Sequence, residues 1–140
     1  KNTTMKATIG HVGINLSSVN NLGFWKELLQ YLEFSIMDQG EHFDATSNGC
    51  YLCVSITEQK YQQDGFHRKR TGLNHIALQV ETAEQVDIFV SEFLEPKGIT
   101  PLYGGAKPYP EYVEGYYAVF FEDLDRIKVE VVYEPQKNES

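Results

Sequence analysis

The chain has 140 residues, of which 41% are hydrophobic and 13% aromatic, and its formal net charge is −8. This length and composition fit one compact domain with a substantial core and argue against intrinsic disorder. The acidic balance disfavours nucleic acid and anionic lipid as partners, and no run approaches the ~18–20 apolar residues of a membrane span. We therefore expect neither nucleic acid nor a membrane as a partner.

The first predicted element, residues 9–17, has a near copy 64 residues later in the chain. The stretch "IGHVGINLS" alternates apolar and polar residues as a half-buried strand does. "GLNHIALQV" (72–80) repeats this pattern, so that His11 aligns with His75. The chain is therefore predicted to contain an internal duplication.

A helix is predicted to follow each of these strands. Ser18 and Thr82 are suitable N-cap residues, and Thr82 with Gln85 would form a capping box. Apolar residues then recur at the three- to four-residue spacing of a buried helix face. The aligned apolar positions are Leu22, Trp25 and Leu29 in the first half and Val86, Phe89 and Phe93 in the second.

The later part of each half also repeats, now with a shift of 77 residues. "CYLCVSI" (50–56) aligns with "IKVEVVY" (127–133), and Asn48-Gly49 before the first is a strong hairpin signal. The two shifts differ by 77 − 64 = 13 residues, which locates an insertion around 103–115. Its Gly, Pro and Tyr content predicts a long loop, so each half has the order βαβββ.

We expect an α+β fold in which two βαβββ modules in tandem form a curved mixed sheet with the helices outside. Within a single domain, 1–140, module one covers about 9–57 and module two about 72–134. The linker, 58–71, is polar and contains the basic cluster "HRKR", which is typical of a solvated connector. A disordered tail is expected at 135–140.

The two cysteines, Cys50 and Cys53, form a C-x-x-C motif inside a predicted strand. Residues three apart in a strand point to opposite faces and lie ~10 Å apart, beyond the reach of a disulfide. A redox motif is therefore disfavoured. Cysteine usage indicates a reducing, cytoplasmic location.

Strand alternation predicts that one histidine from each half lies on the face turned away from the helix. His11 and His75 share that face with Glu130, a carboxylate amid β-branched residues that needs a partner or a metal. Two imidazoles and a carboxylate suit a divalent ion, and three protein ligands leave positions open for a substrate. The repeat position of Glu130 in the first half is Cys53. The competing interpretation is a pair of core histidines and a surface glutamate.

The same face supplies candidate substrate contacts. Lys107, in the inserted loop, is a further candidate, and that loop would form either a lid or a dimer surface. Lys107 and Lys128 are the basic residues expected near a pocket, too few for a highly anionic substrate such as a phosphonate. The strand candidates are Asn15, Tyr51, Ser55, Gln79 and one of Tyr116 or Tyr117. Of these two tyrosines, we predict Tyr117 to be the substrate contact.

The duplicated βαβββ order and the stretches "HVGINL", "LNHIALQV" and "YYAVFFEDLDRIKVEVVY" resemble the vicinal oxygen chelate superfamily over residues 9–134. That superfamily includes glyoxalase I, methylmalonyl-CoA epimerase, fosfomycin-resistance enzymes, extradiol dioxygenases and bleomycin-resistance proteins. The resemblance implies that His11, His75 and Glu130 hold one divalent ion (Zn, Ni, Mn or Fe) that chelates adjacent oxygens of a small metabolite. It also implies a catalytic role for Glu130, and a homodimer.

One position departs from glyoxalase I, in which the fourth strand-borne residue is a carboxylate that helps to move protons. Here it is Cys53, so Glu130 alone would ligate and exchange protons, or a Cys53 thiolate would ligate and favour zinc. Cys53 as a small apolar filler is equally consistent.

We expect a metal-dependent isomerase, lyase or group-transfer enzyme. Three alternatives stay open. One is a metal-free protein of the bleomycin-resistance type that sequesters a drug or metabolite, and another is a ferrous-iron extradiol dioxygenase. The third is a partner-binding domain with a vestigial site, for which "HRKR" is the one hint.

Overall fold

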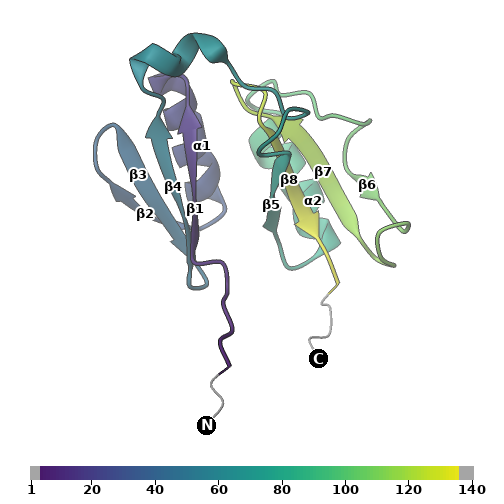
Figure 1. Cartoon of the computed structure of the whole chain (residues 1–140). Coiled ribbons are helices and arrows are strands. Elements are labelled where there is room, and N and C mark those ends of the chain that lie inside the picture. The colour runs from purple at the N-terminus through teal and green to yellow at the C-terminus, as the bar shows by residue number, and fades with distance from the viewer. Residues whose placement is uncertain (1–3, 136–140) are drawn as a thin grey trace. The chain divides into compact units, whose positions relative to one another are not determined.

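A computed structural model describes residues 4–135, and the chain divides into two compact units, Lys1–Gly65 and Phe66–Ser140 (Figure 1). Each unit contains its elements in the predicted order of strand, helix and three strands. The division falls within the stretch 58–71 that the sequence marks as a linker, part of which forms a short 3-10 helix, η1 (Gln59–Asp64). Of the predicted disordered tail, 136–140 lie outside the described residues.

Unit 1 is a four-stranded mixed sheet with one helix on one face. The strand order is β1-β4-β3-β2, in which β1 runs parallel to β4 and the other pairs are antiparallel. Asn48 and Gly49 both have positive φ, 52° and 78°, and form the predicted hairpin turn between β3 and β4. The strands are β1 (His11–Leu16), β2 (Ser35–Asp38), β3 (His42–Ser47) and β4 (Cys50–Ile56).

Helix α1 (Val19–Tyr31) covers the apolar face of this sheet. It begins after Ser18, whose side chain accepts a hydrogen bond from the Asn21 N–H at 3.1 Å, as predicted for the N-cap. Trp25 is completely buried on its inner face. Capping and amphipathic spacing together therefore position the helix.

Unit 2 repeats this architecture. Its strand order is β5-β8-β7-β6, in which β5 runs parallel to β8 and the other pairs are antiparallel. Helix α2 (Ala83–Phe89) continues into a π-helical segment, η2 (Val90–Leu94). The strands are β5 (His75–Gln79), β6 (Lys107–Pro108), β7 (Tyr117–Glu122) and β8 (Lys128–Tyr133).

The N-terminus of α2 has the predicted capping residues in a slightly shifted arrangement. Thr82 accepts a hydrogen bond from the Gln85 N–H at 3.1 Å. The Gln85 side chain accepts in return from the N–H of Glu81 at 2.8 Å, one residue before the cap itself. The reciprocal pair thus satisfies the same kind of free N–H groups as a standard capping box.

The strand registers of the two units are equivalent, and they confirm the duplicated α+β fold. His11 lies opposite Tyr51 in unit 1, and His75 lies opposite Lys128 in unit 2. Two residues further on, the last strands place Cys53 and Glu130 at matching positions. The second sheet face of unit 2 is also covered, because the inserted loop folds over it and buries Tyr109 with Ala118, Phe120 and Val132. No helix among the described residues is long and apolar enough to cross a membrane.

Glu122, at the end of β7, links the linker and the β7–β8 turn through ion pairs with Arg68 and with Arg126. Burial raises the pKa of Glu122, but hydrogen bonds and charges of the two arginines outweigh it and lower that pKa below its ordinary 4.5. A depressed folded-state pKa stabilises the fold above pH 4.5, and this contribution is lost as the pH falls through the folded-state pKa.

Glu122→Gln is therefore expected to lower the free energy of unfolding by about 1 kcal/mol at neutral pH, and by much less in acid. Urea unfolding at a series of pH values measures this difference, with the exposed Glu114→Gln as the control. A destabilisation that stayed constant down to pH values well below 4.5 would contradict the ion-pair explanation.

Candidate functional site

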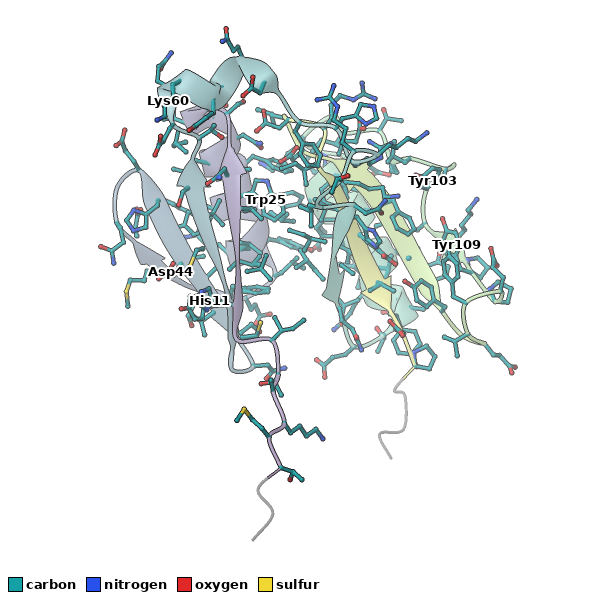
Figure 2. The ribbon with its side chains drawn as sticks, viewed as in Figure 1. His11, Trp25, Asp44, Lys60, Tyr103 and Tyr109 are labelled. Carbon is teal, nitrogen blue, oxygen red and sulfur yellow. The ribbon has the colours of Figure 1, made fainter. Side chains whose placement is uncertain are left out.

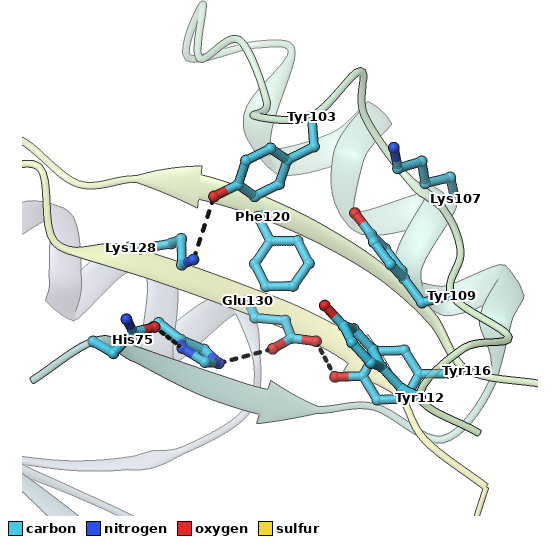
Figure 3. A pocket seen from close by; sticks show the side chains of 10 residues that line it. His75, Tyr103, Lys107, Tyr109, Tyr112, Tyr116, Phe120, Lys128 and Glu130 are labelled. Atoms are coloured by element: carbon cyan, nitrogen blue, oxygen red, sulfur yellow. Dashed lines mark hydrogen bonds and ion pairs between the residues drawn. The ribbon is translucent and has the colours of Figure 1, made fainter. Parts of the chain in front are cut away.

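A pocket of about 630 Å³ lies in unit 2, on the sheet face opposite α2 (Figure 3). Its sheet side is formed by His75 on β5, Phe120 on β7 and the β8 residues Lys128 and Glu130. These residues face the same way because strand side chains alternate and the three strands are neighbours in register. The volume is in the range of small-molecule sites in proteins.

His75 and Glu130 form a close pair at the base of the pocket. Their Nε2 and Oε1 atoms lie 3.2 Å apart, with the Glu130 side chain 2% exposed and the His75 side chain 36% exposed. The Nδ1 of His75 lies 2.7 Å from the side-chain oxygen of Asn74. The other carboxylate oxygen of Glu130 accepts a hydrogen bond from the Tyr116 hydroxyl. Both members of the pair are therefore oriented by a second hydrogen bond.

His75 and Glu130 lie close enough together to bind one cation jointly. The Asn74 oxygen can only accept, so the imidazole carries its hydrogen on Nδ1 and, when neutral, presents the lone pair of Nε2 to Glu130. With a neutral imidazole, the Nε2 of His75 and the Oε1 of Glu130 are two acceptors only 3.2 Å apart, and their lone pairs repel each other. A proton or a metal ion bound by both atoms would remove this repulsion. Ligand bonds of about 2.0–2.1 Å place two ligand atoms of a zinc-like ion roughly 3 Å apart. The pair fits a divalent ion by its donor atoms and spacing.

The inserted loop supplies the opposite side of the pocket. Tyr103, Lys107, Tyr109 and Tyr112 all line it, and β6 holds the loop against β7. The Tyr109 and Tyr112 rings are stacked at 5.4 Å, and Tyr116 meets both edge-on. Burial and the hydrogen bond to Glu130 raise the pKa of Tyr116, so that its phenol stays a donor at neutral pH.

Lys128 is held among rings on the other side of Glu130. Its Nζ donates to the Tyr103 hydroxyl at 3.3 Å and lies 5.4 Å from the centre of the Phe120 ring. Hydrogen bonding from Lys128 is the main cause that lowers the pKa of Tyr103, and the charges of Lys128 and Arg68 act in the same direction. The Tyr103–Lys128 pair therefore presents a cation and an acidified phenol to the pocket.

We expect Tyr103 to ionise before Tyr109 and Tyr116 as the pH rises, since hydrogen bonding from Lys128 lowers the pKa of Tyr103 while burial raises those of Tyr109 and Tyr116. Titration followed by the near-ultraviolet absorbance of tyrosinate measures this order. Tyr103→Phe should remove the earliest phase, and Lys128→Met should move that phase to higher pH. If the earliest phase survives Tyr103→Phe unchanged, it belongs to another residue.

The face of the unit 1 sheet turned away from α1 carries the first-half candidates. His11 stacks on Tyr51 with ring centres 4.6 Å apart, and Asn15 lies opposite Ser55 in register. Cys53 lies opposite Asp44 of β3 (Figure 2 labels His11 and Asp44). The two cysteines are both free thiols.

Hydrogen bonding with Asp44 is the largest cause that raises the pKa of the Cys53 thiol, and burial adds to it. Asp44 thus provides a carboxylate next to the fourth repeat position. The alternation of His42, Asp44 and Thr46 in β3 is a sequence signal that could have found it.

The structure brings some predicted site residues together and separates others. His75, Glu130 and Lys107 line the pocket of unit 2, whereas Gln79 lies outside it, with its amide donating to the Glu134 carbonyl. His11, Asn15, Tyr51, Ser55 and Cys53 lie in unit 1, and each unit is described by itself.

The prediction of Tyr117 as a pocket residue is wrong. Its hydroxyl donates to Asp87 of α2, on the other side of the sheet, and Tyr116 lines the pocket in its place. Side chains along a strand alternate between the two faces of the sheet. Tyr116 lies four residues before Phe120 and therefore shares its face, whereas Tyr117 lies on the opposite face.

Sequence reasoning missed three pocket residues. Asn74 is recognisable only as the residue before His75, and Tyr103 has a φ of 58° that no periodic pattern signals. Phe120 lies within the run "AVFF", in which both faces are apolar, so alternation did not single it out. Among residues 4–135, no group of three or more His, Cys, Asp or Glu side chains is in place to hold a metal ion.

Comparisons with known proteins extend over nearly the whole chain. Uncharacterized protein YqjT of Bacillus subtilis (strain 168) is 36% identical over 110 residues, which cover 79% of this chain and 83% of the relative. A Bacillus halodurans protein of known crystal structure, classed provisionally as a glyoxalase, is 34% identical with a TM-score of 0.81, covering 92% of this chain and 97% of its own. The chain belongs to the vicinal oxygen chelate superfamily. No protein-family profile matches the chain.

A more distant vicinal oxygen chelate fold supports the same architecture. FosX, a fosfomycin resistance protein of Listeria monocytogenes, matches with a TM-score of 0.61 at 16% identity, covering 91% of this chain and 90% of FosX. That structure is of a Glu-to-Gln variant in complex with Mn(II) and a dihydroxypropylphosphonic acid. At this identity the likeness concerns the fold of the superfamily.

Proposed function

We propose that this chain is a metal-dependent enzyme that binds adjacent oxygens of a small metabolite for isomerase, lyase or group-transfer chemistry. His75 and Glu130 are two ligands of one divalent ion (Zn, Ni, Mn or Fe), and His11 is the third. The observation that carries the proposal is the contact of His75 Nε2 with Glu130 Oε1, 3.2 Å apart beside a pocket. Membership of a superfamily that contains such enzymes supports it.

The protein's own residues have distinct roles in this proposal. A divalent ion would act as a Lewis acid that stabilises negative charge on the substrate oxygens. Asn74 orients the His75 ring, and Tyr116 orients the Glu130 carboxylate. Glu130, in the wall of the pocket, is the carboxylate that would exchange a proton with the substrate. Catalysis therefore depends on a carboxylate held inside the pocket wall.

The fourth repeat position has two candidate groups. Cys53 remains a possible ligand, but the raised pKa of its thiol means that the ion would have to displace a proton there. Asp44, opposite Cys53 in the strand register, offers a carboxylate at the same place. Asp44 would then share proton exchange with Glu130, in the role that a carboxylate has at this position in glyoxalase I.

The remaining parts of the proposal concern partners and location. Asn15, Tyr51, Ser55 and Lys107 are proposed substrate contacts of a homodimeric protein, whereas Gln79 lies outside the pocket and is hydrogen-bonded to Glu134. Two free cysteines on one strand are consistent with a cytoplasmic location.

A metal-free sequestering protein is the second candidate function. It is favoured by one observation: the pocket of unit 2 is built largely of aromatic side chains, which bind ligands without any metal. A ferrous-iron dioxygenase would use the same two-histidine, one-carboxylate set, and the identity of the bound ion distinguishes it.

Metal analysis of the purified protein tests the proposal, with His75→Ala as the variant and His67→Ala as the matched histidine control. We expect about one divalent ion per chain in the wild type and in His67→Ala, and its loss in His75→Ala. Absence of any ion from wild type after incubation with each of the four metals would refute the enzyme proposal and favour sequestration.

A further inference from the structure

Phe120 forms an aromatic floor in the pocket of unit 2, and three rings stand steeply against it (Figure 3). The rings of Tyr103 and Tyr109 lie 5.5 and 5.6 Å from Phe120, at interplanar angles of 72° and 83°. His75 lies 6.1 Å away at 65°. Edge-to-face packing fixes all four rings and gives the pocket flat walls. Such a pocket suits a flat, unsaturated ligand better than a bulky aliphatic one.

Lys128 brings a positive charge to these aromatic rings. Within residues 4–135 it forms no ion pair, and Glu122, its register neighbour on β7, pairs with Arg68 instead. Its ammonium has three donors, and the described hydrogen bond to Tyr103 uses one of them. Lys107 adds a second ammonium across the pocket, 5.5 Å from the Tyr109 ring centre. Together they can receive a negatively charged group.

Tyr109 contributes a polar group that lacks a partner in the protein. The residue is 8% exposed, and its buried hydroxyl has no hydrogen-bond partner among the described residues. In Figure 3 the hydroxyl points into the pocket, towards Phe120 and Tyr103. Stacking on Tyr112 holds the ring in this orientation. A buried hydroxyl of this kind needs an acceptor, which a ligand oxygen would supply.

We propose that the pocket of unit 2 binds a small aromatic carboxylate, with the ring against Phe120 and the carboxylate oxygens accepting from Lys128 and from the Tyr109 hydroxyl. This assigns a substrate class to the site of the proposed function and so rests on it for the reaction, but the binding itself uses none of the metal ligands. Two lysines against the single carboxylate of Glu130 leave one positive charge, which matches a monoanion. A cationic ligand fits less well, because the ammonium groups of Lys107 and Lys128 would repel it.

Benzoate is the probe for this proposal, added to the full chain labelled with nitrogen-15 and followed by amide chemical shifts. We expect saturable shifts in β7, β8 and the inserted loop. Lys128→Met should weaken binding by about tenfold, and Tyr109→Phe by about threefold. Lys60→Met is the matched control, because Lys60 also lies over a ring, that of Tyr61 in unit 1. Cyclohexanecarboxylate and benzyl alcohol should both bind more weakly than benzoate, since each lacks one recognised feature.

Equal affinity of wild type and Lys128→Met for benzoate, or shifts outside unit 2, would overturn the proposal. Lys128→Arg keeps the charge and should retain most of the affinity, and the amide spectrum of Lys128→Met shows directly whether that variant is folded. Repeating the titration with a chelator separates this proposal from the enzyme proposal. Benzoate binding without any metal binding refutes the enzyme proposal alone, and metal binding without benzoate binding refutes the aromatic carboxylate alone.

Discussion

Glu130→Gln is expected to weaken divalent metal binding by about a hundredfold or more. The substitution keeps the size of the side chain and a group that can accept from Tyr116, but it removes the negative charge from the proposed ligand set. In the absence of metal, the same substitution should lower the free energy of unfolding by at most about 1 kcal/mol. The reason is that a buried carboxylate carries a desolvation cost that the amide avoids. The variant thus separates metal affinity from stability.

Competition against a chromophoric chelator measures the affinity of Glu130→Gln, and urea unfolding of the metal-free protein measures its stability. Glu111→Gln, an exposed change in the inserted loop, is the control. Wild-type affinity in Glu130→Gln would remove this residue from the ligand set. A large loss of stability without metal would instead make Glu130 a structural carboxylate.

Trp25→Ala is expected to lower the free energy of unfolding by about 3–5 kcal/mol. The Trp25 side chain is completely buried where α1 meets the sheet of unit 1, so truncation leaves a cavity that the neighbouring side chains fill only in part. Chemical unfolding followed by far-ultraviolet circular dichroism is the suitable measurement, because the substitution removes the one tryptophan of the chain. Val19→Ala, at an exposed position of the same helix, is the control. A change below about 1 kcal/mol would show that α1 is held to the sheet elsewhere.

The fold followed from the sequence because its signals are local and occur twice. Alternation in "HVGINL" and "HIALQ" gave the first strands, and Ser18 and Thr82 marked the helix starts. The duplication then fixed the register, since two aligned histidines require the same strand face in both halves. That reasoning placed His75 and Glu130 in one pocket, where the structure finds them in contact.

The inserted loop could not be derived in the same way. Its course depends on three successive residues with positive φ, Tyr103 to Gly105, and on the pairing of β6 with β7. Neither feature produces a periodic pattern of residues in the sequence. The burial of Tyr109 and the contact between Tyr103 and Lys128 could therefore be found only from the structure. Tyr117 was misplaced because "YYAVFF" is apolar on both faces and its phase is set by tertiary contacts.

The duplicated histidine is the central claim, and His11→Ala tests it most directly. The number of divalent ions bound per chain should be measured for the wild type, for His11→Ala and for His75→Ala at equal free metal. If the two histidines are ligands of one ion, each substitution lowers metal affinity by a similar factor, about tenfold to a hundredfold. If His11→Ala binds metal as tightly as the wild type while His75→Ala does not, the repeat does not build the site, and unit 2 binds the ion alone.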